Sequence, residues 1–222
     1  MSKPIHGGGR PKSYRLANGS KAPSVTTITG RFKDAGGLIT WAYNCGKDGI
    51  DMNRVRDNAA DAGHIGHEWV ADTIHSRELT VFPNASEEML GHARSSLAAF
   101  IDWRDRNGVQ FVATELPLVS EKYAFGGTLD ALMLIGALQR LGDWKTGNRI
   151  YPEHIAQLGG YSLLLREHGY SIDGADIVRL PKENGGFSHH AYSLADLELG
   201  EQAFLRMREL YDLDSKLKKV AA

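Results

Sequence analysis

The chain has 222 residues, of which 42% are hydrophobic and 24% are charged. This length fits one compact domain, or one domain with an appendage, and the composition is close to the globular average, which excludes intrinsic disorder. The 26 basic and 27 acidic side chains give a formal net charge of −1. The chain therefore has no overall positive field for nucleic acid, and any anion-binding surface must be a local patch.

Two features of the sequence bear on the cellular compartment. The single cysteine, Cys45, cannot by itself form an internal disulfide, a four-cysteine zinc site or an iron–sulfur cluster, which favours a reducing compartment. The N-terminal residues lack the apolar stretch of a secretory signal, and no apolar run reaches the length of about 18 residues typical of a membrane span. We therefore expect a soluble, cytoplasmic protein that does not contact membranes.

The first half of the chain predicts a short arm followed by helices. Residues 1–13 contain three consecutive glycines and two prolines, a composition typical of a flexible arm. Ser24 has the side chain of a helix N-cap. Residues 54–74 place apolar and small residues at helical spacing, which predicts a helix that another element approaches closely. A second helix is expected to begin after Ser86 and to end at Asn107-Gly108.

The middle of the chain changes from helical periodicity to strand-forming residue types. Residues 109–119, 123–135 and 137–146 are rich in β-branched, aromatic and aliphatic side chains and predict three consecutive strands. The elements expected after them are a helix, two short strands and a final amphipathic helix, at residues 152–168, 174–180, 187–192 and from 193 onward.

Two acidic residues are expected to face each other across the second and third of these strands. If a tight turn at Gly136-Ala137 joins the strands, Asp130 lies directly opposite Asp143. Opposed residues in an antiparallel pair have Cβ atoms about 4.5–5.5 Å apart, and two like charges there are destabilising. Converging carboxylates are the ligands that Mg²⁺ and Mn²⁺ prefer. The strand period of two also places Lys145 on the same face as Asp143, where its ammonium group can act on a water or a phosphate.

Three further polar residues could join this pair. Gln157 and Tyr161 are four positions apart on the next helix and therefore share a face. His67 lies on the small-residue side of the helix at 54–74 and could be a metal ligand. The residues alone leave plainer interpretations open, in which the carboxylates, Lys145 and Gln157 are solvated while Tyr161 and His67 only support the fold.

Four short motifs resemble the RecB-type exonuclease branch of the PD-(D/E)xK nuclease superfamily. In chain order they are GxxGH ending at His67, GGTLD ending at Asp130, DWKT beginning at Asp143, and QLGGY from Gln157 to Tyr161. The PSVT segment at residues 23–26 is similar to that of the small stand-alone members, such as mitochondrial genome maintenance exonuclease and phage-encoded exonucleases. The resemblance spans about residues 20–165.

The pattern and the resemblance together predict an α/β fold. We expect a central mixed β-sheet of about five strands flanked by helices, forming a restriction-endonuclease-like core with an N-terminal helical part. The expected organisation is a flexible arm at residues 1–13 and a single nuclease domain at 14–222. This domain divides into a helical part, a catalytic sheet core and a C-terminal helix, at residues 14–108, 109–192 and 193–222.

The resemblance also implies roles for individual residues. The ligands of the divalent cation would be His67, Asp130, Asp143 and the carbonyl group of Trp144. The catalytic set would be Asp130, Asp143, Lys145, Gln157 and Tyr161, with Lys145 as the catalytic lysine. Glu115 matches a frequently acidic position, and Ser24 and Thr26 could touch backbone phosphate, although helix N-capping explains these last two equally well.

The activity implied is hydrolysis of phosphodiester bonds in DNA, assisted by Mg²⁺ or Mn²⁺, on single strands or from DNA ends, in recombination, repair or replication. The four cysteines of the iron–sulfur members and a GxxxxGK[ST] phosphate loop are both missing, so we expect neither a cluster nor ATP, and a helicase or recombinase would act in trans. The basic residues available for phosphates are Arg31, Lys33, Lys47, Arg149 and Lys182. The alternatives are an endonuclease of the same fold, an inactive nucleic-acid-binding accessory module, and a hydrolase of small phosphoesters.

Overall fold

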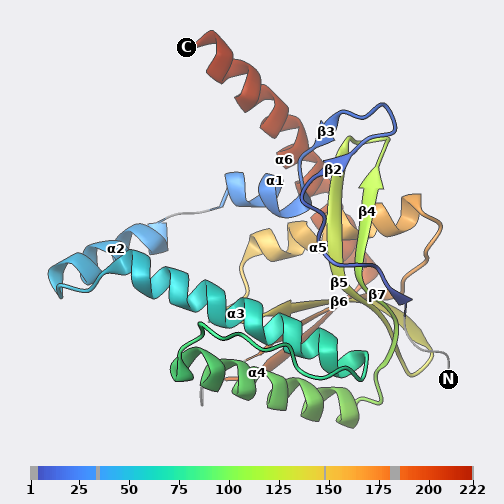
Figure 1. Ribbon diagram of the computed structural model, residues 1–222. Coiled ribbons are helices and arrows are strands. Elements are labelled where there is room, and N and C mark those ends of the chain that lie inside the picture. Colours follow the sequence, from blue (N-terminus) through green and yellow to red (C-terminus); the bar gives the residue numbers. More distant parts are fainter. Residues whose placement is uncertain (1–4, 34–35, 148, 181–185, 222) are drawn as a thin grey trace.

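The computed structural model describes residues 5–33, 36–147, 149–180 and 186–221. A six-stranded mixed sheet with the strand order β1-β4-β5-β6-β7-β8 lies at its centre, and helices cover both faces (Figure 1). The predicted α/β class with a helix-flanked mixed sheet is confirmed. The sheet has one strand more than the five expected, because a short N-terminal strand joins its edge.

The helices and strands follow one another along the chain in this order: β1 (Ile5–His6), β2 (Tyr14–Arg15), β3 (Lys21–Ala22), α1 (Val25–Arg31), α2 (Gly36–Lys47), α3 (Met52–Ile74), α4 (Glu87–Arg106), β4 (Gln110–Ser120), β5 (Phe125–Ile135), β6 (Leu138–Lys145), α5 (Pro152–Glu167), β7 (Gly174–Arg179), β8 (Ser188–Tyr192) and α6 (Leu194–Val220). Helix α2 and the three short strands β1 to β3 were not expected from the sequence. Within the described residues, no helix has the length and apolar character needed to cross a lipid bilayer.

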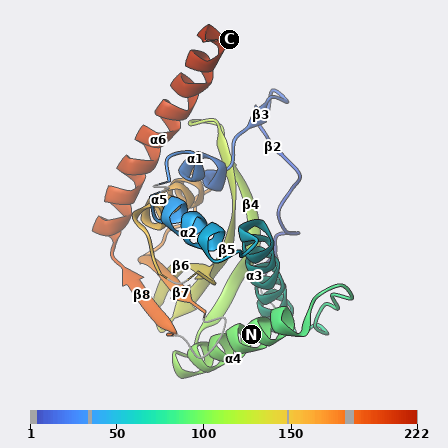
Figure 2. The same cartoon turned by 90° about the vertical axis from the view of Figure 1, so that its left-hand side faces the viewer.

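Each face of the sheet has its own hydrophobic core. Helices α1, α5 and α6 cover one face, where residues such as Ile28, Leu158 and Phe204 pack with the strands. Helices α3 and α4 cover the other, where Phe100 and Trp103 contact Trp144 of β6 (Figures 1 and 2). The central strands therefore have apolar side chains on both faces, as strands buried between helix layers do.

Part of the segment expected as an arm, residues 1–13, forms a strand. Ile5 and His6 form β1, which pairs in parallel with Ala113 and Thr114 of β4. An edge strand such as β4 offers unpaired backbone groups, and these can hold a short segment that has no strand pattern of its own. Residues 1–4 of the predicted arm lie outside the described part of the chain.

The predicted register of β5 and β6 is confirmed up to Ala131, which pairs with Gly142. Beyond this pair, in the part of the sheet that the structure describes, β5 continues along β4 and β6 continues along β7. Strands β5 and β6 therefore separate next to this pair, at Asp130 of β5 and Asp143 of β6.

Helices α5 and α6 cross at a pair of glycines. Gly159 lies in the middle of α5, where glycine lowers helix stability by about 1 kcal/mol relative to alanine. A Cβ at Gly159 would overlap the backbone of Gly200 in α6, so only glycine allows the two helices to come this close. Glycine at this position therefore lowers the helix propensity of α5 but makes the close contact between α5 and α6 possible.

This crossing makes a prediction about stability. The substitution Gly159→Ala should lower the free energy of unfolding by roughly 1–3 kcal/mol, because the added carbon forces the helices apart. Gly91→Ala in α4 is the matched control, since a Cβ there meets no atom within 4 Å, and it should stabilise the protein by roughly 0.5–1 kcal/mol. Urea denaturation measures both. Equal stabilities of the two variants would contradict the close crossing.

Candidate active site

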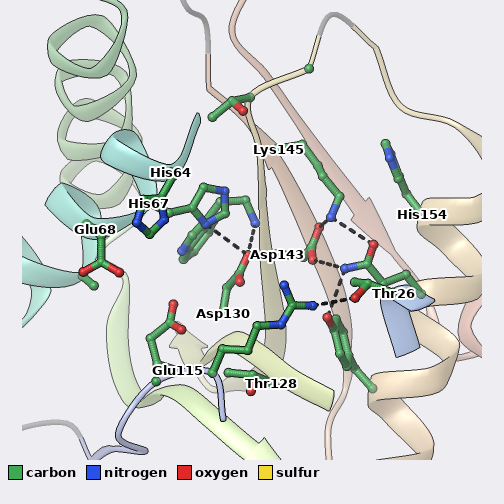
Figure 3. Close-up of a pocket in the computed structure, with 18 of the residues that line it drawn as sticks. Thr26, His64, His67, Glu68, Glu115, Thr128, Asp130, Asp143, Lys145 and His154 are labelled. Atoms are coloured by element: carbon green, nitrogen blue, oxygen red, sulfur yellow. Dashed lines mark hydrogen bonds and ion pairs between the residues drawn. The ribbon is translucent and has the colours of Figure 1, made fainter. Parts of the chain in front are cut away.

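A cleft of about 720 Å³ lies where the sheet opens between β5 and β6. Its lining comes from elements far apart in the sequence. Helix α3 contributes His64, His67 and Glu68, the strands β4 to β6 contribute acidic residues and one lysine, and α5 contributes polar side chains on the opposite wall (Figure 3). The N-terminal residues His6, Gly8, Gly9 and Arg10 also line it. Most of the residues singled out by sequence therefore meet in one place.

The alternation of β6 divides its last residues between the two faces of the sheet. Asp143 and Lys145 both contact Gln157 of α5. Trp144, between them, points to the other face and packs edge-on against Phe100 and Trp103, with ring centroids 5.3 and 5.7 Å away. Because side chains alternate along a strand, the two charged groups face the cleft, and the indole between them packs in the core on the other side.

Four polar side chains form one connected network in the cleft. The Lys145 ammonium lies 2.6 Å from Asp143 Oδ2 and donates to Gln157 Oε1 at 3.1 Å. The Gln157 amide group in turn donates to Asp143 Oδ1 at 3.1 Å and to the hydroxyl oxygen of Tyr161 at 3.2 Å. Each of these groups is held by at least one other, so the ammonium has a defined position.

Asp130 occupies a different place from the one expected. The two aspartates are not a pair in the strand ladder, because the Asp130 carboxylate turns to the main chain and accepts the N–H of Trp144 at 2.7 Å. This bond satisfies the amide that the opening of the ladder would leave unpaired. His67 Nδ1 lies 4.0 Å from Asp130 Oδ2, so α3 brings its histidine to the same carboxylate (Figure 3).

Burial controls the protonation of the groups around Asp143. Burial raises the pKa of Asp143, the Lys145 ammonium opposes this, and the charge of Asp130 raises the pKa further. Burial also raises the pKa of Tyr161 well above its usual range, so its hydroxyl stays neutral. His154 responds in the opposite sense, because burial and the charge of Lys145 lower its pKa to about 4. At neutral pH the positive charge of this wall of the cleft is therefore that of Lys145 and not of His154.

A second acidic group lies on the α3 side of the cleft. Glu115 of β4 faces Asp130 and Glu68 (Figure 3). Burial, followed by the charges of Asp130 and Glu68, raises the pKa of Glu115 to about 8. Its backbone has a positive φ of 47°, which is uncommon for a residue other than glycine. The three carboxyl groups therefore share less negative charge at neutral pH than their number suggests.

The raised pKa of Glu115 predicts a pH-dependent stability. The folded state keeps this proton up to about pH 8, whereas the unfolded chain loses it near pH 4.5, so wild-type stability falls as the pH rises through this window. Glu115→Gln removes the effect and should be more stable than wild type at pH 9 by about 1 kcal/mol or more, with a smaller difference at pH 5. Urea denaturation in EDTA measures this, with the exposed Glu198→Gln as the baseline. A difference that does not change with pH would contradict the raised pKa of Glu115.

The two hydroxyl residues of the PSVT segment have different surroundings. Ser24 is the N-cap of α1, where its hydroxyl accepts the N–H of Thr27 at 3.0 Å, and it is not among the residues that line the cleft. Thr26 lines the cleft and accepts a hydrogen bond from Arg10.

Sequence reasoning missed several residues of the lining, which are Arg10, His64, Glu68, Thr128, Tyr151 and His154. Two of them carried a usable signal. His154 lies three positions before Gln157 on α5, and the helical spacing that linked Gln157 to Tyr161 could have included it. Thr128 lies two positions before Asp130 on β5 and so shares its face of the strand.

Comparison with known proteins gives a likeness of fold. No protein-family model matches the chain, and no curated protein matches its sequence. Among solved structures, the alkaline exonuclease LHK-Exo from Laribacter hongkongensis is similar, with 18% identity, a TM-score of 0.35 and coverage of 73% of this chain and 91% of that one. Its complex with dAMP gives 17% identity, a TM-score of 0.34 and coverage of 73% and 92%. The structure of SSO0001 gives 16% identity and a TM-score of 0.32, and the match covers 53% of this chain and 59% of that one. Likeness at this level concerns the fold alone.

Proposed function

We propose that this protein is a metal-dependent deoxyribonuclease that hydrolyses phosphodiester bonds as an exonuclease, on single-stranded DNA or at DNA ends. One observation carries the proposal: two aspartates and a fixed ammonium group meet where the sheet opens. Lys145 is held at 2.6 Å from Asp143, and Asp130 is anchored on the intervening residue, Trp144. Carboxylates beside an ammonium group are suited to binding a cation and a phosphate together.

The donor set of the cleft fits a hard divalent cation. Asp130, Asp143 and the carbonyl group of Trp144 offer oxygen atoms, and the buried charge of Asp143 beside Asp130 is one that a cation would offset. Across the residues that the structure describes, no three His, Cys, Asp or Glu side chains form a ready metal site. Asp130 and Asp143 supply two carboxylates, and Mg²⁺ is commonly bound by one or two carboxylates while it keeps several waters. His67 would be an additional ligand.

The side chains around the carboxylates have separate tasks in this proposal. A divalent cation bound by Asp130 and Asp143 would supply Lewis-acid stabilisation of charge on the phosphate. The Lys145 ammonium, fixed by Asp143 and Gln157, donates a hydrogen bond to the attacking water or to the phosphate oxygen on which charge develops. Tyr161 holds the Gln157 amide group and stays neutral. The contacts with Asp143 and Gln157 thus orient the ammonium group.

Basic residues at the cleft support a nucleic-acid substrate in a chain of net charge −1. Lys33 and Arg149 line the cleft, and both cations lie over the ring of Tyr151, at 5.6 and 5.1 Å from its centroid. Arg31 has a different role, because it forms an ion pair with Asp214 of α6 at 2.7 Å. Lys182 lies outside the described residues. Phosphate contacts from such residues position a strand without reading its sequence.

The test is incubation of end-labelled linear DNA, single-stranded and double-stranded, and of circular DNA without ends, with Mg²⁺, Mn²⁺ or EDTA. We expect mononucleotides from labelled ends, only with a divalent cation, and no cutting of the circle. Cutting of the circle would show an endonuclease, and binding of DNA without any cleavage would show an accessory module. Hydrolysis of small phosphoesters alone would contradict a DNA substrate.

A further inference from the structure

The N-terminal segment is anchored on the edge of the sheet beside the cleft. The N–H group of Gly7, directly after β1, donates to the carbonyl oxygen of Thr114 at 2.9 Å. The His6 ring packs edge-on against that of His75, with centroids 4.8 Å apart. A Cβ on Gly7 would overlap the carbonyl group of Glu115, so this close approach requires glycine. The contacts hold the chain in place up to residue 7.

Beyond this anchor the chain turns and brings one arginine to the cleft. Gly8 and Gly9 have positive φ angles of 87° and 79°, a conformation that glycine adopts without strain. The turn places Arg10 in the lining of the cleft that also holds Asp130. The Arg10 guanidinium donates to Thr26 Oγ1 at 2.5 Å, a bond drawn at the labelled Thr26 in Figure 3.

The charge of Arg10 is available to a ligand. The side chain is exposed, and within the described residues its hydrogen-bond partner is the neutral hydroxyl of Thr26. Its charge also reaches the site, since it lowers the pKa of Glu115 and of Tyr161 against the larger opposing effect of burial. A guanidinium group has five N–H donors in a planar fork that matches the oxygens of a phosphate. One bond to Thr26 leaves most of this fork unused.

We propose that Arg10 binds a backbone phosphate of the DNA strand that is being cut and so places this strand across the cleft. The inference rests on the proposed function and adds a substrate-binding residue to it. Thr26 fixes one side of the guanidinium, and the anchor at Gly7 limits how far the arginine can move. If Arg10 only balanced the acidic groups of the cleft, its loss would not remove a phosphate contact.

Salt dependence of DNA binding distinguishes these roles, because each phosphate contact to a single strand contributes about −0.7 to the slope of log K against log salt concentration. Binding of fluorescent oligo(dT) in EDTA is followed by anisotropy. We expect Arg10→Ala to bring the slope about 0.7 closer to zero and to weaken binding about tenfold at low salt. Arg10→Lys should keep the slope. The control is Arg15→Ala in β2, whose guanidinium donates to Gly19 O at 2.8 Å outside the cleft lining.

The outcomes separate this inference from the proposed function. An unchanged slope for Arg10→Ala, or an equal loss for Arg15→Ala, would overturn the inference even if the wild type cuts DNA normally. A wild type that neither binds oligo(dT) nor cuts DNA with Mn²⁺ would overturn both proposals. Gly7→Ala provides a second variant, since displacing the anchor should reproduce the loss of slope, and thermal melts exclude unfolding as its cause.

Discussion

Lys145→Ala should reduce DNA cleavage by about 10²–10³-fold or abolish it, while DNA and metal binding stay largely intact. The ammonium acts on charge that develops during the reaction, so its loss affects the transition state more than the bound ground state. The position of the ammonium depends on protein contacts with Asp143 and Gln157, which supports this separation. Single-turnover cleavage of end-labelled DNA and binding of the same DNA in EDTA measure the two effects independently.

The control for this variant removes a lysine charge far from the proposed site. Lys122→Ala, on the exposed turn between β4 and β5, should cleave at the wild-type rate. Because Lys145→Ala leaves the buried Asp143 without its ion pair, thermal melts must show a folded protein, and Lys145→Gln offers a variant of similar size. Cleavage by folded Lys145→Ala above one tenth of the wild-type rate would contradict the role of the ammonium.

Asp143→Asn should change stability little without metal and markedly with metal. The raised pKa of Asp143 means that the folded state keeps the proton to a higher pH than the unfolded chain, so ionisation costs stability as the pH rises through this range. A neutral asparagine avoids this cost but gives up the ion pair with Lys145, so the stability of the apo variant should stay within about 1 kcal/mol of wild type. With Mn²⁺ at a hundredfold excess over Kd, wild type should gain about 2.7 kcal/mol, and the variant should lose most of that gain.

Thermal melts of both proteins in EDTA and in saturating Mn²⁺ give the four values needed. The matched control is Asp176→Asn on the neighbouring strand β7, whose equally buried carboxylate pairs with Arg140 and with His189 at 2.7 Å. Breaking that buried ion pair should cost roughly 3–5 kcal/mol in either medium and leave the Mn²⁺ increment unchanged. If Asp143→Asn behaved like Asp176→Asn, its carboxylate would be structural.

The parts of the fold that sequence could predict are those with local signals. The N-caps at Ser24 and Ser86, the three central strands and the tight turn at Gly136-Ala137 all depend on neighbouring residues, and the structure has them where expected. The turn fixed the register of β5 against β6 as far as Ala131. The register could not reveal that Asp130 turns to the backbone of the next strand, since the end of a ladder depends on the whole sheet.

The missed parts depend on contacts between distant segments. β1 has two residues and exists because the edge of β4 is available. Helix α2 leaves Leu38, Ile39 and Tyr43 exposed and buries Cys45 alone among its residues, so it lies outside the packed core. Arg10 and Glu68 join the cleft from the N-terminal segment and from α3, and neither lies near the DxK strand in sequence. The residue types indicated the chemistry of the site, but the full set of residues that line it follows only from the tertiary structure.

The opposed faces of β6 also limit which sequence changes this region can accept. Side chains on a strand alternate, so inserting or deleting one residue between Asp130 and Asp143 would exchange the faces of the residues that follow. The carboxylate and the ammonium would then enter the aromatic cluster around Phe100, and the indole of Trp144 would fill the cleft. Point substitutions in the β5–β6 turn leave the faces of the strands unchanged, but Gly136 has a positive φ of 61°, a conformation that favours glycine. Natural variants of this chain should therefore keep both the length of that turn and its glycine.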